Sequence, residues 1–199
     1  MDPKTLTRLS KKLSWLLRHG AAEARVPMDA AGWAPEEAVL AFLGVSREAL
    51  RQAVDENTKS RLQWEQGRIR ACQGHSTEGT PVTAEALEAS WTVFAGEGPL
   101  WHGTALEALP AIARDGLLPM ARTHVHLAAA EESRVGKRAG VDVLLRVEVA
   151  ALARAGLRVF ESPNGVLLVR SVPPAAISAA LPCTKAAERE RASLERLFR

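Results

Sequence analysis

Leucine recurs every three or four positions through the first twenty residues, and polar residues fill most of the positions between. The apolar positions are Leu6, Leu9, Leu13, Leu16 and Leu17. This spacing is that of one face of an α-helix, and Asp2 followed by Pro3 suits the helix start. Because Gly20 ends the pattern, Arg18 and His19 are expected in the last turn of this helix.

Two more helices and a hairpin are predicted before residue 80. One helix runs from about 35 to 43, and Ser46 can cap the next. Residues 61–65 and 68–72 then alternate in polarity on either side of Gln66-Gly67, which indicates a hairpin. Helices followed by a two-stranded wing are typical of winged-helix modules, which commonly bind nucleic acid.

A polar stretch separates this half of the chain from the rest. Residues 77–98 are rich in Thr, Glu, Gly and Pro and are expected to form a linker with a short helix near 84–89. The chain is therefore divided into an N-terminal lobe at 1–80, a linker at 81–98 and a C-terminal lobe at 99–199.

Short apolar runs alternate with small helical segments in the C-terminal lobe. Strands are expected at 100–102, 125–127, 143–149, 158–160 and 166–169, the last two joined by the turn Ser162-Pro-Asn-Gly165. Helices are expected at 106–115, at 131–139, just before Gly156 and, at the surface, after Thr184. Short strands with small helices between them predict an α+β fold.

Composition narrows the class of protein. The chain has 199 residues, of which 47% are hydrophobic and 25% charged, and a net charge of +3. Two cysteines, Cys72 and Cys183, are too few for a disulfide framework. No signal-peptide pattern and no apolar run long enough for a bilayer is present, so we expect a cytoplasmic monomer that does not bind a membrane.

Basic residues from three separate segments suggest phosphate chemistry. Arg18-His19 ends the predicted first helix, Arg61 begins the predicted hairpin, and Arg122 opens the segment that leads into the predicted strand at 125–127. The planar fork of arginine matches the oxygens of a phosphate, and a neighbouring histidine can supply a proton. His102-Gly103-Thr104 ends a predicted strand, where an imidazole, a hydroxyl and backbone groups suit a ribose or an amide. These segments predict an enzyme that acts on a phosphate group.

Each motif also has a plainer interpretation. Arg18 and His19 could simply complement the dipole at the helix C-terminus. His124 and His126 lack a third ligand, so no zinc site is expected. Core packing is the expected role of four tryptophans, with base stacking an alternative for the third: Trp15, Trp33, Trp64 and Trp91.

Taken together, the motifs resemble the RNA 2′-phosphotransferase family, also called tRNA 2′-phosphotransferases. In the first half the matching segments are Leu9-Ser-Lys-Lys-Leu-Ser-Trp-Leu-Leu-Arg-His19, Gly32-Trp33, Asn57-Thr-Lys-Ser-Arg61 and Ile69-Arg-Ala-Cys-Gln-Gly-His-Ser76. In the second half they are Leu100-Trp-His-Gly-Thr104, Gly116-Leu117, Met120-Ala-Arg-Thr-His-Val-His-Leu127, Val135-Gly-Lys-Arg138, Ser162-Pro-Asn-Gly-Val166 and Val172-Pro-Pro174. The segments follow the order of the family over nearly the whole chain.

The resemblance implies an N-terminal winged-helix lobe that binds RNA and a C-terminal lobe with the ADP-ribosyltransferase fold that binds NAD⁺ as a co-substrate. It implies removal of an internal 2′-phosphate from RNA, with tRNA splicing as one source of the substrate. The phosphate attacks the nicotinamide ribose, nicotinamide leaves, and the ADP-ribosylated phosphate then cyclises to give 2′-OH RNA and ADP-ribose 1″,2″-cyclic phosphate. No metal is expected.

The resemblance also implies roles for individual residues. The catalytic residues would be Arg18, His19, Arg61 and Arg122, and His19 would give a proton to the departing RNA oxygen. The residues expected to bind NAD⁺ are His102, Gly103, Thr104, Gly116, His126 and Arg138.

Two alternatives stay open. An ADP-ribosyltransferase that modifies phosphorylated nucleic-acid ends or a protein would stop after the first step and keep the NAD⁺ lobe. A winged-helix regulator without enzymatic activity would need a helix that reads base edges. The helix at 46–57 is acidic at its end, which disfavours the regulator.

Overall fold

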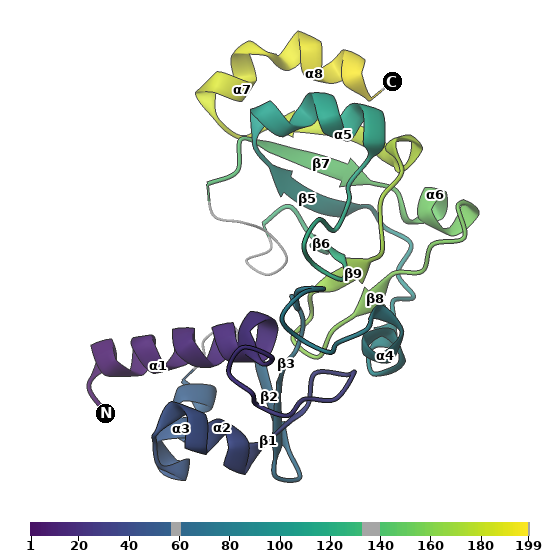
Figure 1. Cartoon of the computed structure of the whole chain (residues 1–199). Helices are drawn as coiled ribbons and strands as arrows, with labels where there is room; N and C mark the ends of the chain where they lie inside the picture. The colour runs from purple at the N-terminus through teal and green to yellow at the C-terminus, as the bar shows by residue number, and fades with distance from the viewer. Residues whose placement is uncertain (57–60, 133–139, 199) are drawn as a thin grey trace. The chain divides into compact units, whose positions relative to one another are not determined.

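The computed structural model describes residues 1–56, 61–132 and 140–198, and it folds as two compact units (Figure 1). The first unit comprises Met1–Trp91 together with Ala121–Thr123. The second comprises Thr92–Met120 and His124–Arg199. The three residues around Arg122 therefore belong with the N-terminal part of the chain, although the sequence places them in the C-terminal lobe.

The first helix, α1, spans Pro3–Trp15 and confirms the leucine pattern. Its N-terminus is capped as expected, because the Asp2 carboxylate accepts hydrogen bonds from the backbone N–H groups of Lys4 and Thr5. The chain then tightens into one π-helical turn, Leu16–Gly20, which holds Arg18 and His19. The leucine face lies in the core of the first unit, which also contains Val39, Leu50 and Ile69.

Two helices and a small sheet complete this core. The elements are β1 (Ala34–Pro35), α2 (Glu36–Leu43), α3 (Arg47–Asp55), β2 (Leu62–Glu65) and β3 (Arg68–Ala71). The predicted hairpin is confirmed, since β2 and β3 pair antiparallel and Gln66 and Gly67 both have positive φ in the turn between them. The strand β1 pairs with β3, which gives the order β1-β3-β2.

The stretch expected to be a linker contains ordered structure. The predicted short helix is confirmed as α4 (Ala84–Ala89), which Thr83 caps. Trp91 follows it, is 8% exposed, and donates from its indole N–H to the carbonyl of Cys72. The next residues form β4 (Thr92–Val93), the first strand of the second unit.

The second unit is built on two antiparallel sheets. One has the order β10-β7-β5, from β5 (Leu100–Thr104), β7 (Val143–Val147) and β10 (Ile177–Pro182). The other has the order β4-β8-β9-β6, from β4, β6 (Val125–Leu127), β8 (Phe160–Glu161) and β9 (Leu167–Val169). Trp101 and Ala128 exchange two backbone hydrogen bonds of 2.9 and 2.8 Å, which link β5 to the residue after β6.

Helices pack around these sheets: α5 (Leu109–Asp115) after the short turn Leu106–Ala108, α6 (Val149–Arg154), the turn Pro174–Ala176, α7 (Lys185–Arg189) and α8 (Arg191–Leu197). The mixture of helix and sheet confirms the α+β class. The strand predicted at 143–149 ends at Val147, because Val149 begins α6. The helix predicted at 131–139 falls largely outside the described residues, and Glu131 and Glu132 lie in a turn.

Two features of the C-terminal region differ from the sequence expectation. The pattern gave no sign of β10, whose alternation is interrupted by a register shift between Ile177 and Ala179. The predicted surface helix is two short helices, and Leu194 is 2% exposed in the core of the second unit. No helix in the described parts of the chain is long and apolar enough to cross a membrane.

Candidate active site

Arg18 and His19 lie in the π-helical turn at the end of α1. A π turn closes i to i+5 and is uncommon, and such turns are often found at functional sites because they re-aim side chains. Here the turn sets the backbone of Gly20 against the indole of Trp15, five residues earlier. A Cβ atom at position 20 would overlap that ring, so the motif requires glycine at this point.

A loop from the end of the hairpin crosses this turn. The backbone N–H of Ser76 donates to the carbonyl of Arg18 over 2.9 Å, and that of Ala22 donates to the carbonyl of Gly79 over 3.0 Å. Gly79 has a φ of +76°, and a Cβ atom there would overlap the carbonyl oxygen of His19. The loop can therefore lie this close to the turn only because residue 79 is glycine.

The same loop binds the segment that carries Arg122. Ser76 and Arg122 are antiparallel bridge partners, and the flanking bonds run from Thr77 N–H to Ala121 O and from Thr123 N–H to His75 O. The backbones of Arg18, Ser76 and Arg122 thus lie in adjacent positions within the first unit. Residues more than one hundred positions apart in the sequence meet through this one loop.

The imidazole of His19 is held by a side chain that the sequence analysis did not assign to the site. Its Nδ1 lies 2.5 Å from the hydroxyl oxygen of Ser76. This contact fixes the ring and leaves Nε2 as the nitrogen that points away from Ser76. Partial loss of hydration, followed by repulsion from Arg18 and Arg122, lowers the pKa of His19.

Arg18 carries the clearest sign of a ligand site. Its Nε and Nη2 atoms are buried and have no hydrogen-bond partner within the described residues. Burial, with repulsion from Arg61 and Arg122, lowers the pKa of Arg18 to about 10. A buried donor without a partner costs about 1–3 kcal/mol, and more when it is charged, so an anion at this point would offset an existing cost.

Arg61 joins the cluster from the start of the hairpin, close enough to Arg18 for repulsion between the two guanidinium groups. It lies just before β2, and its carbonyl accepts a 2.8 Å hydrogen bond from the backbone N–H of Cys72. Burial raises the pKa of the Cys72 thiol to about 11, which keeps it protonated near neutral pH. The four predicted catalytic residues are therefore brought together within the first unit, as three guanidinium groups and one imidazole.

The second unit joins two of the residues predicted to bind NAD⁺. His102 Nδ1 lies 2.9 Å from the backbone carbonyl of His126, across β5 and β6. Because a carbonyl oxygen only accepts hydrogen bonds, Nδ1 carries the proton and the lone pair of the neutral ring is on Nε2. The ring is thereby fixed in one tautomer, with an acceptor nitrogen suited to a hydroxyl group.

Both predicted glycines have a packing role in the structure. A Cβ atom at Gly103 would overlap the side chain of Val141, and one at Gly116 would overlap the carbonyl of Val172. Gly116 also has a φ of +78° where it ends α5. Thr104 is half-buried at the end of β5, and Arg138 lies outside the described residues.

Comparisons with known proteins now decide the family. The family model described as RNA 2′-phosphotransferase, Tpt1 / KptA family, matches residues 4–171. The chain belongs to this family. The match runs through the first unit and into the second as far as residue 171, and it confirms the resemblance drawn from the motifs.

Curated relatives carry the same description. A probable RNA 2′-phosphotransferase of Pseudomonas syringae pv. tomato is 36% identical over 183 residues, which cover 87% of this chain and 94% of the relative. One of Rhizobium johnstonii is 34% identical over 180 residues, with 87% and 94% covered. One of Herpetosiphon aurantiacus is 38% identical over 186 residues, with 88% and 97% covered. Family and relatives together support an RNA 2′-phosphotransferase activity.

The geometry explains family motifs that sequence reasoning left without a role. Gln73-Gly-His-Ser76 reads alone as a polar turn, but it is the segment that joins Arg18 to Arg122. His75 is fully buried, and Gly32, at a φ of +83°, leaves room for its ring. The signal available in the sequence was only the presence of this turn in the family pattern.

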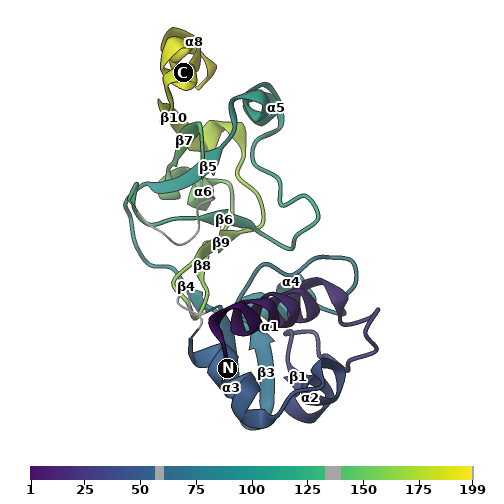
Figure 2. The same ribbon diagram turned by 90° about the vertical axis from the view of Figure 1, so that its left-hand side faces the viewer.

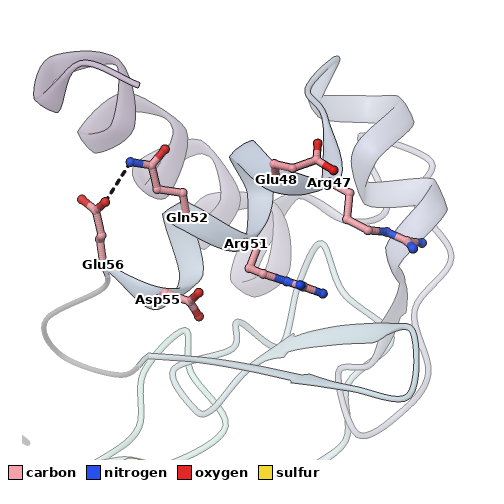
Figure 3. Close-up of a pocket in the computed structure, with 6 residues that line it drawn as sticks. All are labelled: Arg47, Glu48, Arg51, Gln52, Asp55 and Glu56. Carbon is pink, nitrogen blue, oxygen red and sulfur yellow. Dashed lines mark hydrogen bonds between the residues drawn. The ribbon is translucent and has the colours of Figure 1, made fainter.

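A pocket elsewhere on the first unit has different chemistry. It measures about 370 Å³ and lies on the outer face of α3, and Figure 3 shows its six lining residues. They are Arg47, Glu48, Arg51, Gln52, Asp55 and Glu56. Three carboxylates against two arginines make a poor surface for a polyanion, which agrees with the argument against a regulator that reads DNA through this helix.

Proposed function

We propose that this protein is an NAD⁺-dependent RNA 2′-phosphotransferase that uses the Arg18 cluster to hold the 2′-phosphate. The observation that carries the proposal is the pair of buried donor atoms of Arg18, Nε and Nη2, which have no hydrogen-bond partner among the described residues and feel the charges of Arg61 and Arg122. A phosphate dianion would satisfy these donors and neutralise the repulsion among the arginines. RNA with an internal 2′-phosphate is the substrate, and tRNA is one candidate.

The fold of each unit supports this division of labour. The order of α1, α2 and α3 followed by the β2–β3 hairpin suits a winged-helix-like RNA lobe. The two antiparallel sheets of the second unit suit an ADP-ribosyltransferase-like lobe. In this proposal the first unit holds the RNA phosphate and the second holds NAD⁺ as the co-substrate.

The first step needs orientation more than proton transfer. An oxygen of the RNA 2′-phosphate bonds to the anomeric carbon of the nicotinamide ribose as the carbon–nitrogen bond breaks, and nicotinamide leaves as a neutral molecule with the bonding electrons. The dianion is already a nucleophile, so no general base is required. Arg18 and Arg61 hold two of its oxygens and aim the third.

The second step depends more strongly on the arginines and on His19. The ribose 2″-hydroxyl of the ADP-ribosylated phosphate attacks phosphorus and releases its proton to solvent. The bond to the RNA 2′-oxygen breaks, and that oxygen takes up a proton to become the RNA 2′-hydroxyl. Arginines stabilise the charge that develops on the five-coordinate phosphorus. His19, oriented by Ser76, gives the proton to the departing oxygen through Nε2.

The lowered pKa of His19 fits this role once substrate is present. In the protein without substrate, Arg18 and Arg122 disfavour the imidazolium form. A bound phosphate dianion opposes these two cations, which raises the pKa of His19 and makes a proton available. The same cluster therefore couples substrate binding to protonation of the acid.

The residues of the second unit fit a nucleotide sugar. His102 offers an acceptor on Nε2 in a fixed tautomer, and the half-buried hydroxyl of Thr104 lies two residues further along β5. Both group types bind ribose hydroxyls. NAD⁺, when bound, supplies the activated anomeric carbon, and these residues would orient its ribose.

The deciding experiment uses a short RNA with one internal 2′-phosphate, incubated with and without NAD⁺ while RNA and nucleotide products are followed. NAD⁺-dependent formation of 2′-OH RNA and ADP-ribose 1″,2″-cyclic phosphate is the expected result. RNA that gains ADP-ribose and goes no further would instead indicate the ADP-ribosyltransferase alternative. Loss of 2′-phosphate without NAD⁺ would overturn the proposed chemistry.

A pair of variants ties the reaction to the site. Arg18→Ala should remove at least 99% of turnover while NAD⁺ affinity by calorimetry stays normal, since two charge-assisted contacts of about 1.5–3 kcal/mol each are lost. Arg196→Ala, an exposed arginine on α8, is the matched control and should retain full turnover.

A further inference from the structure

The outer face of α1 carries a basic stripe that leads, by way of an exposed tryptophan, to the candidate active site. Figure 2 shows α1 at the surface of the first unit. Lys4, Arg8, Lys11 and Trp15 are all exposed, and their spacing of four, three and four residues places them on one side of the helix. The next position on that side is His19, which is also exposed.

The stripe is free of acidic residues. Between Pro3 and Gly20 the chain contains five lysines and arginines and no aspartate or glutamate: Lys4, Arg8, Lys11, Lys12 and Arg18. The outer face of α3 in the same unit has two arginines and three carboxylates (Figure 3). The difference shows that the positive charge on α1 is a local property and does not reflect the modest net charge of the chain.

An aromatic side chain interrupts the stripe one turn before the active site. The sequence predicts core packing for Trp15, but this residue is 38% exposed. Its ring stacks on Phe42 of α2, with centroids 6.5 Å apart and planes at 30°, and it also lies against the backbone of Gly20. Lys12 Nζ sits 4.8 Å from the centroid of the Phe42 ring. The indole is thus fixed in place while more than a third of its residue surface faces solvent.

We propose that this face of α1 is the track for the RNA strand that adjoins the 2′-phosphate. In this assignment Lys4, Arg8 and Lys11 contact backbone phosphates, and Trp15 stacks on a base next to the reacting nucleotide. Aromatic platforms beside a line of cations are the usual means of binding single-stranded RNA without sequence preference. The inference rests on the proposed function, because it takes RNA as the substrate.

The length of the stripe on α1 and the chemistry of its side chains both favour RNA as the molecule that binds there. From Lys4 to Trp15 the helix rises about 16 Å, at about 1.5 Å per residue. A stacked strand advances about 3.4 Å per nucleotide, so this length matches on the order of five nucleotides. An amphipathic membrane-binding or protein-binding helix would need several apolar residues on the outer face, and Trp15 is the single one on this stripe.

The test measures binding and does not depend on turnover or NAD⁺. The variant K4Q/R8Q/K11Q is compared with the wild type for affinity to a single-stranded RNA of about 12 nucleotides with ordinary 2′-hydroxyls, by fluorescence anisotropy across a salt series. Each lost phosphate contact removes about 0.7 from the slope of log affinity against log salt. We expect the slope to fall by about 2 and the Kd at low salt to rise by about tenfold or more.

A matched control keeps the same change in charge. K185Q/R189Q/R196Q removes three exposed cations from α7 and α8 of the second unit and should leave the Kd and the slope unchanged. An equal loss of RNA affinity in both variants, or no loss of affinity in the α1 variant, would overturn the proposal that α1 binds the RNA strand. Binding of anionic lipid vesicles that depends on the α1 cations, without RNA binding, would overturn it in favour of a membrane surface.

The stacking residue needs its own pair of variants. W15F keeps an aromatic ring and should bind RNA within about twofold of the wild type, whereas W15L keeps apolar contact with Phe42 but should weaken binding by about fivefold to a hundredfold, the range of one lost base stack. A W15L protein that melts normally and binds RNA like W15F would exclude stacking. These readouts remain valid even if no phosphate is removed, so failure of the track and failure of the proposed function can be told apart.

Discussion

In the first unit the Nε and Nη2 atoms of Arg18 are buried and have no hydrogen-bond partner among the described residues. In the second unit, by contrast, the His102 ring donates a hydrogen bond to the carbonyl of His126. Two hydrogen-bond donors of Arg18 are therefore unsatisfied and lie near other cations, whereas the ring donor of His102 is satisfied. The first arrangement costs stability until an anion arrives. The second costs nothing in the absence of a ligand.

This difference corresponds to two ways of preparing a site. A charged phosphate can supply a large interaction energy, so the protein can store an unfavourable cluster of arginines that binding relieves. A ribose hydroxyl is neutral and supplies less interaction energy. The side chain that binds it must therefore already be in the right tautomer and orientation. Under the proposed function, the first unit gives up stability in exchange for phosphate binding, whereas the second binds a ribose through groups that are already in position.

The largest expected effect comes from removing the unsatisfied group. Arg18→Met keeps the length of the side chain but removes its charge, so turnover should fall at least about a hundredfold while the free energy of unfolding rises by about 1–3 kcal/mol. Single-turnover rates and urea denaturation measure the two quantities. A variant that is both active and less stable would show that Arg18 has a structural partner, and Arg196→Met on α8 is the control.

A smaller effect is expected in the second unit, where structure and binding can be separated. His102→Asn keeps a donor near the position of Nδ1 and loses the acceptor at Nε2, whereas His102→Ala loses both. Both variants should raise the KM for NAD⁺ by about tenfold, but only the alanine variant should lower the free energy of unfolding, by about 1 kcal/mol. An asparagine variant with a normal KM would remove His102 from the NAD⁺ site.

Ser76 should have a more modest effect, because it acts through His19. Ser76→Ala removes the hydroxyl 2.5 Å from Nδ1 of His19 and leaves the backbone hydrogen bond to Arg18 in place. We expect kcat to fall about threefold to tenfold, the cost of one ordinary hydrogen bond, with the KM for NAD⁺ unchanged. Ser76→Thr should restore the rate, and the exposed neighbour Thr77→Ala is the control. An equal loss in both alanine variants would point to a general change in the loop.

The smallest expected effect is an electrostatic change in the pKa of His19, which NMR titration measures. Arg122 is one of the cations that lower the pKa of this imidazole, so Arg122→Gln should shift the pKa upward. Because protonation is penalised in the folded protein, the wild type loses stability as the pH falls below about 6.5, and the variant should lose less. Arg51→Gln on α3 should leave the titration unchanged. A downward shift in Arg122→Gln would contradict the proximity of the two groups.

Local elements were predictable because their signals are local. Leucine spacing, the Asp2 cap and the Gln66-Gly67 turn correctly gave α1 and the β2–β3 hairpin, and the position of Arg18 and His19 in the last turn followed from them. The π geometry of that turn left no mark in the hydrophobic pattern. The strand β10 was missed because its pairing depends on β7, some thirty residues earlier.

The sequence by itself determined the family, the α+β class and the types of residue in the candidate site, since these depend on the order of motifs and on local periodicity. Only the tertiary structure decided that Arg122 lies in the first unit, that Ser76 holds His19, and that Trp15 is exposed beside a basic face. Each of these depends on contacts between residues far apart in the chain, and Gly32 and Gly79 permit such contacts where a side chain would not fit. Sequence patterns describe neighbours along the chain, whereas an unsatisfied arginine is defined by the neighbours that folding brings to it in space.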